Sequence, residues 1–323
     1  MTMNSSKMLF LTTMVMGITM SISSSNWIMI WCGLEISLIS FIPLMINKLT
    51  ISSESMMKYF IVQSISSSML MLGMLIMIMS GDYNYDYMLL TALLIKSGVS
   101  PFHNWVLTVL EGLSLSMLMI MLTINKIAPL TLMSYLTNKT MMIIIITVLV
   151  GAILGLNQNS IKKMIGYSSI FNMGFILSVL KFNLMWIFYL TIYSIMLLMM
   201  MVILNVNNVN YINQMVFSET ISNKMSLWIN LLSMGGMPPL VGFSIKYMSM
   251  WYLISMKLVL TISIMVMLSL LIMFLYLRMT FLALMNNSIT NKIKMFNSNE
   301  ISMYIMCVNT LTLPIMFLVK PFF

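Results

Sequence analysis

Charged residues are scarce in this sequence of 323 residues: they make up 7% of it, whereas apolar residues make up 60%. Roughly a quarter of the residues of a soluble domain are charged, so this composition excludes an ordinary soluble protein. A membrane core about 30 Å thick requires about 20 apolar residues per crossing helix, and only helices or closed barrels satisfy their backbone there. The apolar runs are continuous rather than alternating, which predicts an all-α integral membrane protein.

Cysteine and histidine are almost missing. Cys32 and Cys307 stand at opposite ends of the chain, no CxxC motif occurs, and His103 is the single histidine. Iron–sulfur clusters, haem and structural zinc need several such ligands, so we expect neither a cofactor nor a metal in this chain. A phosphate-cradling glycine loop and a Ser–His–Asp set are also missing, which argues against bond-making chemistry within the chain.

The net charge of +9 does not predict nucleic-acid binding, because lysine and arginine never gather into an exposed arm with interleaved aromatics. The 45 methionines are scattered over every span, which makes a copper pathway through thioethers the weaker interpretation. Abundant Ile, Asn and Ser with the single arginine Arg278 are typical of an AT-rich genome that reads ATA as Met, as in animal mitochondria.

The apolar runs form about 11 predicted spans, joined by short loops into a single polytopic membrane domain over residues 1–323. A first span of this kind resembles a signal peptide, but no small-residue cleavage site follows it and a second apolar run resumes at once. The predicted spans are 6–22, 26–46, 54–79, 86–106, 114–136, 140–156, 162–180, 184–205, 225–251, 258–282 and 300–319.

Basic residues are distributed unequally over the two sides of these spans. Nine lie on the side of the N-terminus and four on the other, and the positive-inside rule therefore places the N-terminus in the matrix or cytoplasm. The nine are Lys7, Lys48, Lys58, Lys162, Lys163, Lys224, Arg278, Lys292 and Lys294; the four are Lys139, Lys181, Lys257 and Lys320.

Lys96, Lys126 and Lys246 lie inside stretches that are too apolar for charge. An ionisable side chain in a bilayer costs about 2.5–3.5 kcal/mol even on lenient scales, so one that is retained usually faces a cavity or a relay. Ion or proton movement is therefore the leading hypothesis.

Helix breakers accompany these lysines. Gly98 and Pro101 follow Lys96, and the Gly235–Pro239 segment precedes Lys246, which predicts two discontinuous helices, near Lys96-Pro101 and Gly235-Pro239. A discontinuous helix exposes backbone groups that bind ions or water in the membrane. The alternative for each break is a packing kink.

Two further titratable residues belong to the candidate site. Glu35 is the one carboxylate deep within a span, and a pair that it forms with Lys96 would act either as a switch or as a static neutralising pair. His103 stands seven residues after Lys96, which on a regular helix is the same face, so it is a possible relay. A histidine satisfied by local backbone is the alternative.

Seven segments of the sequence form a recognisable series: Gly33–Ile36, Glu54–Phe60, Leu94–Trp105, Asn125–Pro129, Gly155–Gln158, Lys162–Ser169 and Gly235–Phe243 with Lys246. Taken in order, these segments resemble the antiporter-like chain 2 family of respiratory complex I in its short animal form. Two positions depart from the family pattern: Val106 stands where the family usually has proline, and Asn172 stands where it often has histidine.

The resemblance implies a proton-translocating subunit of NADH:ubiquinone oxidoreductase in the mitochondrial inner membrane, with the N-terminus on the matrix side. It implies that FMN, iron–sulfur clusters and ubiquinone belong to partner subunits, and that the chain contacts other membrane-arm subunits, including antiporter-like neighbours, and phospholipids. By the same resemblance Glu35 and Lys96 are the coupled pair, Lys126 is the central relay lysine and Lys246 is the lysine at the exit-side break.

Two other functions remain open from the sequence. A stand-alone sodium/proton antiporter of the same fold predicts transport by the isolated chain. A structural membrane subunit without a relay role predicts normal proton pumping after Lys126 is neutralised.

Overall fold

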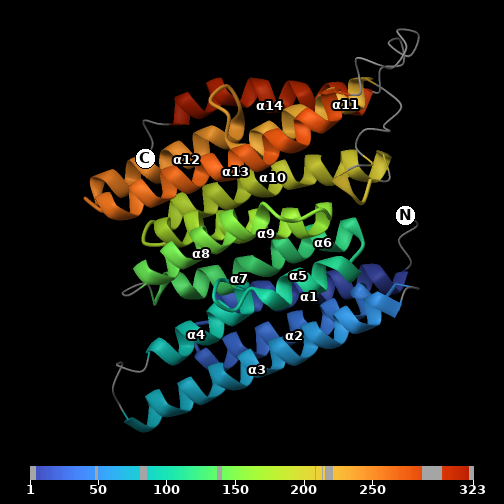
Figure 1. Cartoon of the computed structure of the whole chain (residues 1–323). Helices are drawn as coiled ribbons and strands as arrows, with labels where there is room; N and C mark the ends of the chain where they lie inside the picture. The colour runs from blue at the N-terminus through green and yellow to red at the C-terminus, as the bar shows by residue number, and fades with distance from the viewer. Residues whose placement is uncertain are drawn as a thin grey trace. The chain divides into compact units, whose positions relative to one another are not determined.

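The computed structural model describes residues 5–47, 50–80, 86–136, 140–207, 209–212, 214, 221–285 and 300–319. These ranges are dominated by α-helices, as the sequence predicts, and within them the only β-type pairing is an isolated bridge between Ser160 and Tyr211. The chain divides into two compact units, Met1–Ile143 and Ile144–Phe323. Figure 1 follows the helices of both units by colour from blue to red.

The first unit is built around α3, which packs against α2, α4 and α5. In addition α1 packs along α2, α4 packs on α7, and α6 and α7 follow one another (Figure 1). Its helices are α1 (Ser5–Ser23), α2 (Trp27–Met45), α3 (Thr50–Ser80), α4 (Asp86–Ser97), α5 (Asn104–Gly112), α6 (Leu115–Leu122) and α7 (Ile124–Ser134).

The second unit starts inside α8, and α12 is its most connected helix, with contacts to α9, α10, α11, α13 and α14. The helices α11, α13 and α14 pack together as a second group. The helices are α8 (Met141–Gly155), α9 (Ile161–Val179), α10 (Asn183–Asn207), α11 (Ile221–Gly235), α12 (Val241–Ser255), α13 (Val259–Met285) and α14 (Glu300–Val319).

Helix positions agree with the predicted spans, although whether each span crosses a membrane is a separate question. Among the described residues, six helical stretches are long and apolar enough to cross one. The number of spans, about 11, therefore stays a prediction. The six are Ser5–Ser23, Trp27–Met45, Thr50–Met79, Leu115–Ser134, Leu184–Asn207 and Val259–Phe281.

Three predicted spans are interrupted in the structure. The segments 98–103 and 236–240 separate α4 from α5 and α11 from α12, at the glycines and prolines that the sequence marks. The third interruption, at Thr123 between α6 and α7, was not predicted. The Thr123 hydroxyl bonds to the Met119 carbonyl at 2.8 Å, and the Lys126 amide turns back to the Thr123 carbonyl at 3.1 Å, which tightens the helix there.

The close packing of α1 against α2 relies on two glycines. A Cβ added to Gly17 would lie 2.8 Å from the Gly33 carbonyl oxygen, and one added to Gly33 would lie 2.7 Å from the Gly17 carbonyl oxygen. Small residues allow helix backbones to approach in membranes, where packing drives association. These two glycines therefore set the separation of α1 and α2.

Serine and threonine hydroxyls within the helices bond mainly to their own backbone. Ser66 donates to the Gln63 carbonyl at 2.7 Å and Ser67 to the Ser64 carbonyl at 2.9 Å, each three residues back. The same pattern recurs along α1, α9 and α13. Local bonding of this kind satisfies the hydroxyl without a partner on another helix.

Candidate functional site

Lys96 is the penultimate residue of α4, beside a turn that its neighbours stabilise. The side-chain amide of Gln63 donates to the Lys96 carbonyl at 3.3 Å, and the indole of Trp105 donates to the Ile95 carbonyl at 3.1 Å. These bonds satisfy carbonyls that a helix end leaves free. The chain then reverses at Gly98, whose φ of +69° favours glycine and whose missing side chain leaves space for Val106.

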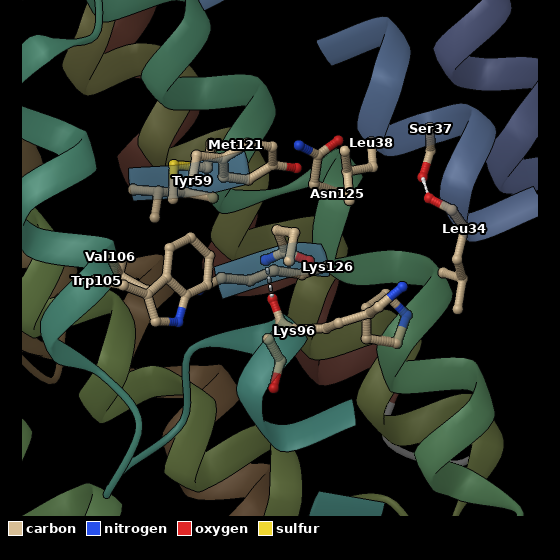
Figure 2. Close-up of a pocket in the computed structure, with 14 residues that line it drawn as sticks. Leu34, Ser37, Leu38, Tyr59, Lys96, Trp105, Val106, Met121, Asn125 and Lys126 are labelled. Atoms are coloured by element: carbon tan, nitrogen blue, oxygen red, sulfur yellow. Dashed lines mark hydrogen bonds between the residues drawn. The ribbon is translucent and has the colours of Figure 1, made fainter. Parts of the chain in front are cut away.

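A cavity of the first unit is lined by both Lys96 and Lys126 (Figure 2). Its volume available to water is about 40 Å³. A buried water needs roughly 10–15 Å³ in this measure, so the cavity has room for a few water molecules. Polar lining comes from four helices: Ser37 of α2, Tyr59 and Gln63 of α3, Lys96 and Ser97 of α4, and Asn125 and Lys126 of α7.

Lys126 lies on α7 with 6% of its surface exposed, and Lys96 is 8% exposed. Next to Lys126, both polar atoms of the Asn125 amide are buried and find no hydrogen-bond partner within the described ranges. A buried amide of this kind is expected to bind water. Pro129 has no N–H, so the Asn125 carbonyl four residues back lacks its usual helix donor and is available as an acceptor. The polar groups around Lys126 thus favour a hydrated cavity.

Glu35 lies half-buried on α2 and is not among the residues that line this cavity. Its charge acts through space on Lys96 and on the Tyr59 hydroxyl. Its Oε1 atom is buried and has no hydrogen-bond partner among the described residues. Glu35 is thus placed to influence Lys96 electrostatically, and the coupled-pair role stays a prediction.

His103 is buried, and its Nδ1 lies 3.3 Å from the Pro101 carbonyl. The helical argument that places it on the face of Lys96 is wrong, because residues 98–103 are not helical. His103 does not line the cavity with Lys96. A local backbone contact is the alternative that the sequence left open, and a relay role of His103 stays a prediction.

Lys246 occupies the second unit, on the first turns of α12, and is 5% exposed. Its ammonium donates to the Gly235 carbonyl at 2.7 Å and to the Met234 carbonyl at 3.3 Å, at the C-terminal end of α11. Carbonyls there are free of helix partners and carry partial negative charge. The ring of Phe171 adds a cation–π contact, with Nζ 5.5 Å from its centroid. We call the Met234 and Gly235 carbonyls together with the Phe171 ring the Lys246 socket.

Sequence reasoning found the lysines but missed the groups that hold them. Three aromatic residues were not assigned to the site. Tyr59 lines the cavity, Trp105 bonds to the end of the helix that carries Lys96, and Phe171 contacts the Lys246 ammonium. Trp105 lies in the motif that follows Lys96, which is the only signal that points to it. Phe171 carries none, because an aromatic residue in an apolar helix is usually packing.

The comparisons with known proteins first define the class of this fold. A family model described as "NADH:quinone oxidoreductase/Mrp antiporter, TM" matches residues 24–86 and 81–272. A chain of respiratory complex I from Thermus thermophilus has a TM-score of 0.84 and 17% identity, covering 98% of this chain and 80% of that one. A chain of the Mrp complex from Dietzia has a TM-score of 0.76 and 16% identity, covering 84% and 59%. The fold is that of the antiporter-like membrane proteins.

Curated relatives narrow this class. The chain is 35% identical to NADH-ubiquinone oxidoreductase chain 2 of Anopheles gambiae, over 86% of each chain. It is 34% identical to the protein of that name from Locusta migratoria, over 90% of each chain. The chain belongs to the NADH-ubiquinone oxidoreductase chain 2 family.

Proposed function

We propose that this chain is a proton-translocating membrane-arm subunit of NADH:ubiquinone oxidoreductase, driven by electron transfer in partner subunits. The observation that carries the proposal is the placement of buried lysines at helix ends, two of them on one cavity with room for water. An ammonium in such a cavity exchanges its proton with water, whereas one buried in a dry core does not. Family membership supplies the partner chemistry.

Within the first unit, Lys126 is the central carrier and Glu35 sets the charge balance of Lys96. Moving one charge against about 100 mV costs about 2.3 kcal/mol. A tenfold change in the proton affinity of a lysine is worth about 1.4 kcal/mol, so modest changes in its surroundings are on the required scale. In the second unit Lys246 releases or accepts the proton while its socket holds it in place.

We also propose how the chain is arranged in the membrane. About 11 spans form a single membrane domain over residues 1–323, and the α4–α5 and α11–α12 pairs are discontinuous membrane helices. The N-terminus lies on the matrix side of the inner mitochondrial membrane. Part of the supporting charge count, at Lys48, Lys139, Lys292, Lys294 and Lys320, lies outside the described residues.

The proposed partners follow from the family. The redox centres, FMN and iron–sulfur clusters, belong to other subunits, and so does ubiquinone. In the described part of the chain, no group of three or more potential metal ligands is found. Other membrane-arm subunits, including antiporter-like neighbours, and phospholipids cover the apolar surface. Nucleic acid is not a partner.

The testing experiment is Lys126→Ala, placed at the equivalent position of a tractable homologous complex and assayed for proton pumping and NADH:ubiquinone turnover. We expect both to fall roughly tenfold or more with normal assembly, since loss of a proton carrier typically costs at least that. Replacing the exposed Lys181 by Ala is the matched control and leaves both unchanged. Normal pumping in Lys126→Ala would reduce this lysine to a packing charge.

A stand-alone sodium/proton antiporter is the second candidate, favoured by the structural likeness to an Mrp complex chain. It predicts sodium-dependent proton movement when this chain alone is placed in liposomes. The complex I proposal predicts activity only in the assembled enzyme. Transport by the isolated chain would therefore favour the antiporter.

A further inference from the structure

The two helix breaks marked by glycine are built in the same way. The helix α4 ends at Ser97 and α11 ends at Gly235. A glycine of positive φ follows each end directly, Gly98 at +69° and Gly236 at +89°. At both ends the amide of the residue after the glycine bonds to a carbonyl five residues back, at 3.2 Å. This is the Schellman arrangement, and because the two ends share it, carbonyls at matching positions can be compared.

The matching carbonyls have partners of different charge. Lys96 and Met234 each stand two residues before the glycine. The Lys96 carbonyl accepts from the neutral side-chain amide of Gln63 at 3.3 Å. The Met234 carbonyl accepts from the ammonium of Lys246, also at 3.3 Å. The end of α4 is thus closed by a neutral donor, whereas the end of α11 binds a charge.

A second neutral donor closes the end of α4. The indole N–H of Trp105 donates to the Ile95 carbonyl at 3.1 Å. The indole is packed on two sides: a Cβ added to Gly98 would lie 3.3 Å from its Cζ2, and the Tyr59 ring centroid lies 5.9 Å from its own. Tyr59 and Gln63 are four residues apart on α3, so one face of α3 supports both donors.

Both donors and both lysines of the first unit line the same cavity (Figure 2). A carbonyl left without a donor at this wall would attract an ammonium, as the Met234 carbonyl attracts that of Lys246. An ammonium bound in this way holds its proton more firmly and releases it to water less readily. The neutral donors therefore prevent the end of α4 from competing with water for the lysines.

We propose that Gln63 and Trp105 are positioning residues for proton transfer, because they occupy the carbonyls at the end of α4 and leave the ammonium groups of Lys96 and Lys126 to the cavity water. The inference rests on the proposed function of these two lysines. Neither Gln63 nor Trp105 gives or takes a proton itself. In the second unit the same kind of helix end has the opposite task, since it holds Lys246 in its socket.

The titratable groups around the cavity come from four helices. Lys96, Lys126 and Tyr59 line it from α4, α7 and α3, and Glu35 of α2 acts on Lys96 through space. Substituting Gln63 or Trp105 changes none of these groups, so a new pH dependence of turnover would report on their surroundings. The other charged residues of α3, α4 and α5 lie away from the cavity lining: Glu54, Lys58, Asp86 and Glu111.

The test uses Gln63→Met and Trp105→Phe, singly and together, in this chain within the assembled complex. Methionine keeps the length of the side chain and phenylalanine keeps an aromatic ring, but both lack the donor. We expect coupled turnover at neutral pH to fall severalfold in the double variant and its pH optimum to rise by about one unit, since a hydrogen bond to a charged group is worth about that. Each single variant moves the optimum in the same direction.

Trp186→Phe on α10 is the matched control. Trp186 is 3% exposed, and its indole N–H is buried without a hydrogen-bond partner among the described residues. The substitution removes the same part of a side chain without freeing a carbonyl, so it can lower the melting temperature but keeps the pH optimum. If the Gln63 and Trp105 variants also melt lower at an unchanged optimum, the two residues only cap α4 and the inference is wrong. The single variants decide this if the double variant does not assemble.

Lys126→Ala, measured in parallel, separates this inference from the proposed function. If Lys126→Ala is inactive while the Gln63 and Trp105 variants keep the original pH optimum, the positioning role is wrong and the proposed function stands. If Lys126→Ala pumps normally, the proposed function fails and this inference fails with it.

Discussion

The ammonium of Lys246 donates a hydrogen bond of 2.7 Å to the carbonyl of Gly235, the residue with which α11 ends. The buried lysine and the end of α11 thus supply each other with a hydrogen-bond partner. The lysine gains acceptors in an apolar unit, and the helix end gains a donor for a carbonyl that lacks one.

The first prediction concerns Gly236, which has φ +89° and whose added Cβ would lie 3.0 Å from Lys246 Nζ. We expect Gly236→Ala to destabilise the second unit by about 1–3 kcal/mol, because alanine is strained at this φ and crowds the ammonium. Thermal inactivation of pumping in membrane vesicles measures the effect. Gly235→Ala is the control, because its Cβ meets only an ordinary contact at 3.5 Å. Equal stability of the two variants would contradict the socket geometry.

A second prediction concerns Gly33, where a Cβ meets the Gly17 carbonyl oxygen at 2.7 Å. We expect Gly33→Ala to force α1 and α2 apart and to cost about 1–3 kcal/mol, as overpacking does in tightly packed cores. The yield of assembled complex on native gels measures this cost. Ile39→Ala on the same helix is the comparison, since Ile39 is 63% exposed. An undiminished yield of Gly33→Ala would show that α1 and α2 adjust easily.

The third prediction is Glu35→Gln, which keeps the shape of the side chain and removes its charge. We expect slower coupled turnover with normal assembly, because Lys96 loses the carboxylate that acts on it through space. Glu54→Gln tests for a general charge effect, since Glu54 is exposed at the start of α3. The role of Glu35 would be refuted by turnover equal to that of the Glu54 variant.

A fourth prediction separates activity from stability at Asn125. Asn125→Leu removes an amide whose polar atoms are buried without a partner among the described residues, so stability is unchanged or rises. We expect turnover to fall severalfold, because an apolar side chain reduces the water held beside Lys126. Melting of the purified complex and NADH:ubiquinone turnover are measured together. Asn309→Leu on α14 controls for amide loss in general; a fall in stability of Asn125→Leu would contradict this account.

Sequence reasoning located the helices because an apolar run bounded by polar residues has few alternatives in a membrane protein. Glycine and proline marked the interruptions near Gly98 and Gly236, where backbone chemistry alone decides. Thr123 was missed because its effect comes from a hydroxyl bond to its own helix, which threonine forms in unbroken helices too.

The lysines of the site were predictable, since a charge in an apolar span has a large cost. Their surroundings were not. That Lys96 and Lys126 share a cavity depends on how α4 packs on α7, and no local pattern encodes that contact. His103 does not share a helix face with Lys96 for a related reason, since Pro101 lies in a non-helical segment between them.

The serine and threonine bonds to the carbonyls of their own helices have a consequence for sequence drift. The hydroxyl of Ser66 or Ser67 donates to a carbonyl of its own helix, whatever that helix packs against. Replacing the serine by alanine removes the hydroxyl and leaves no buried donor without an acceptor. Such serine-to-alanine substitutions therefore change the free energy of folding little. Base-composition pressure can therefore exchange serine and alanine at such sites at little energetic cost, whereas a change at Lys246 or at Gly236 beside it alters a contact between helices.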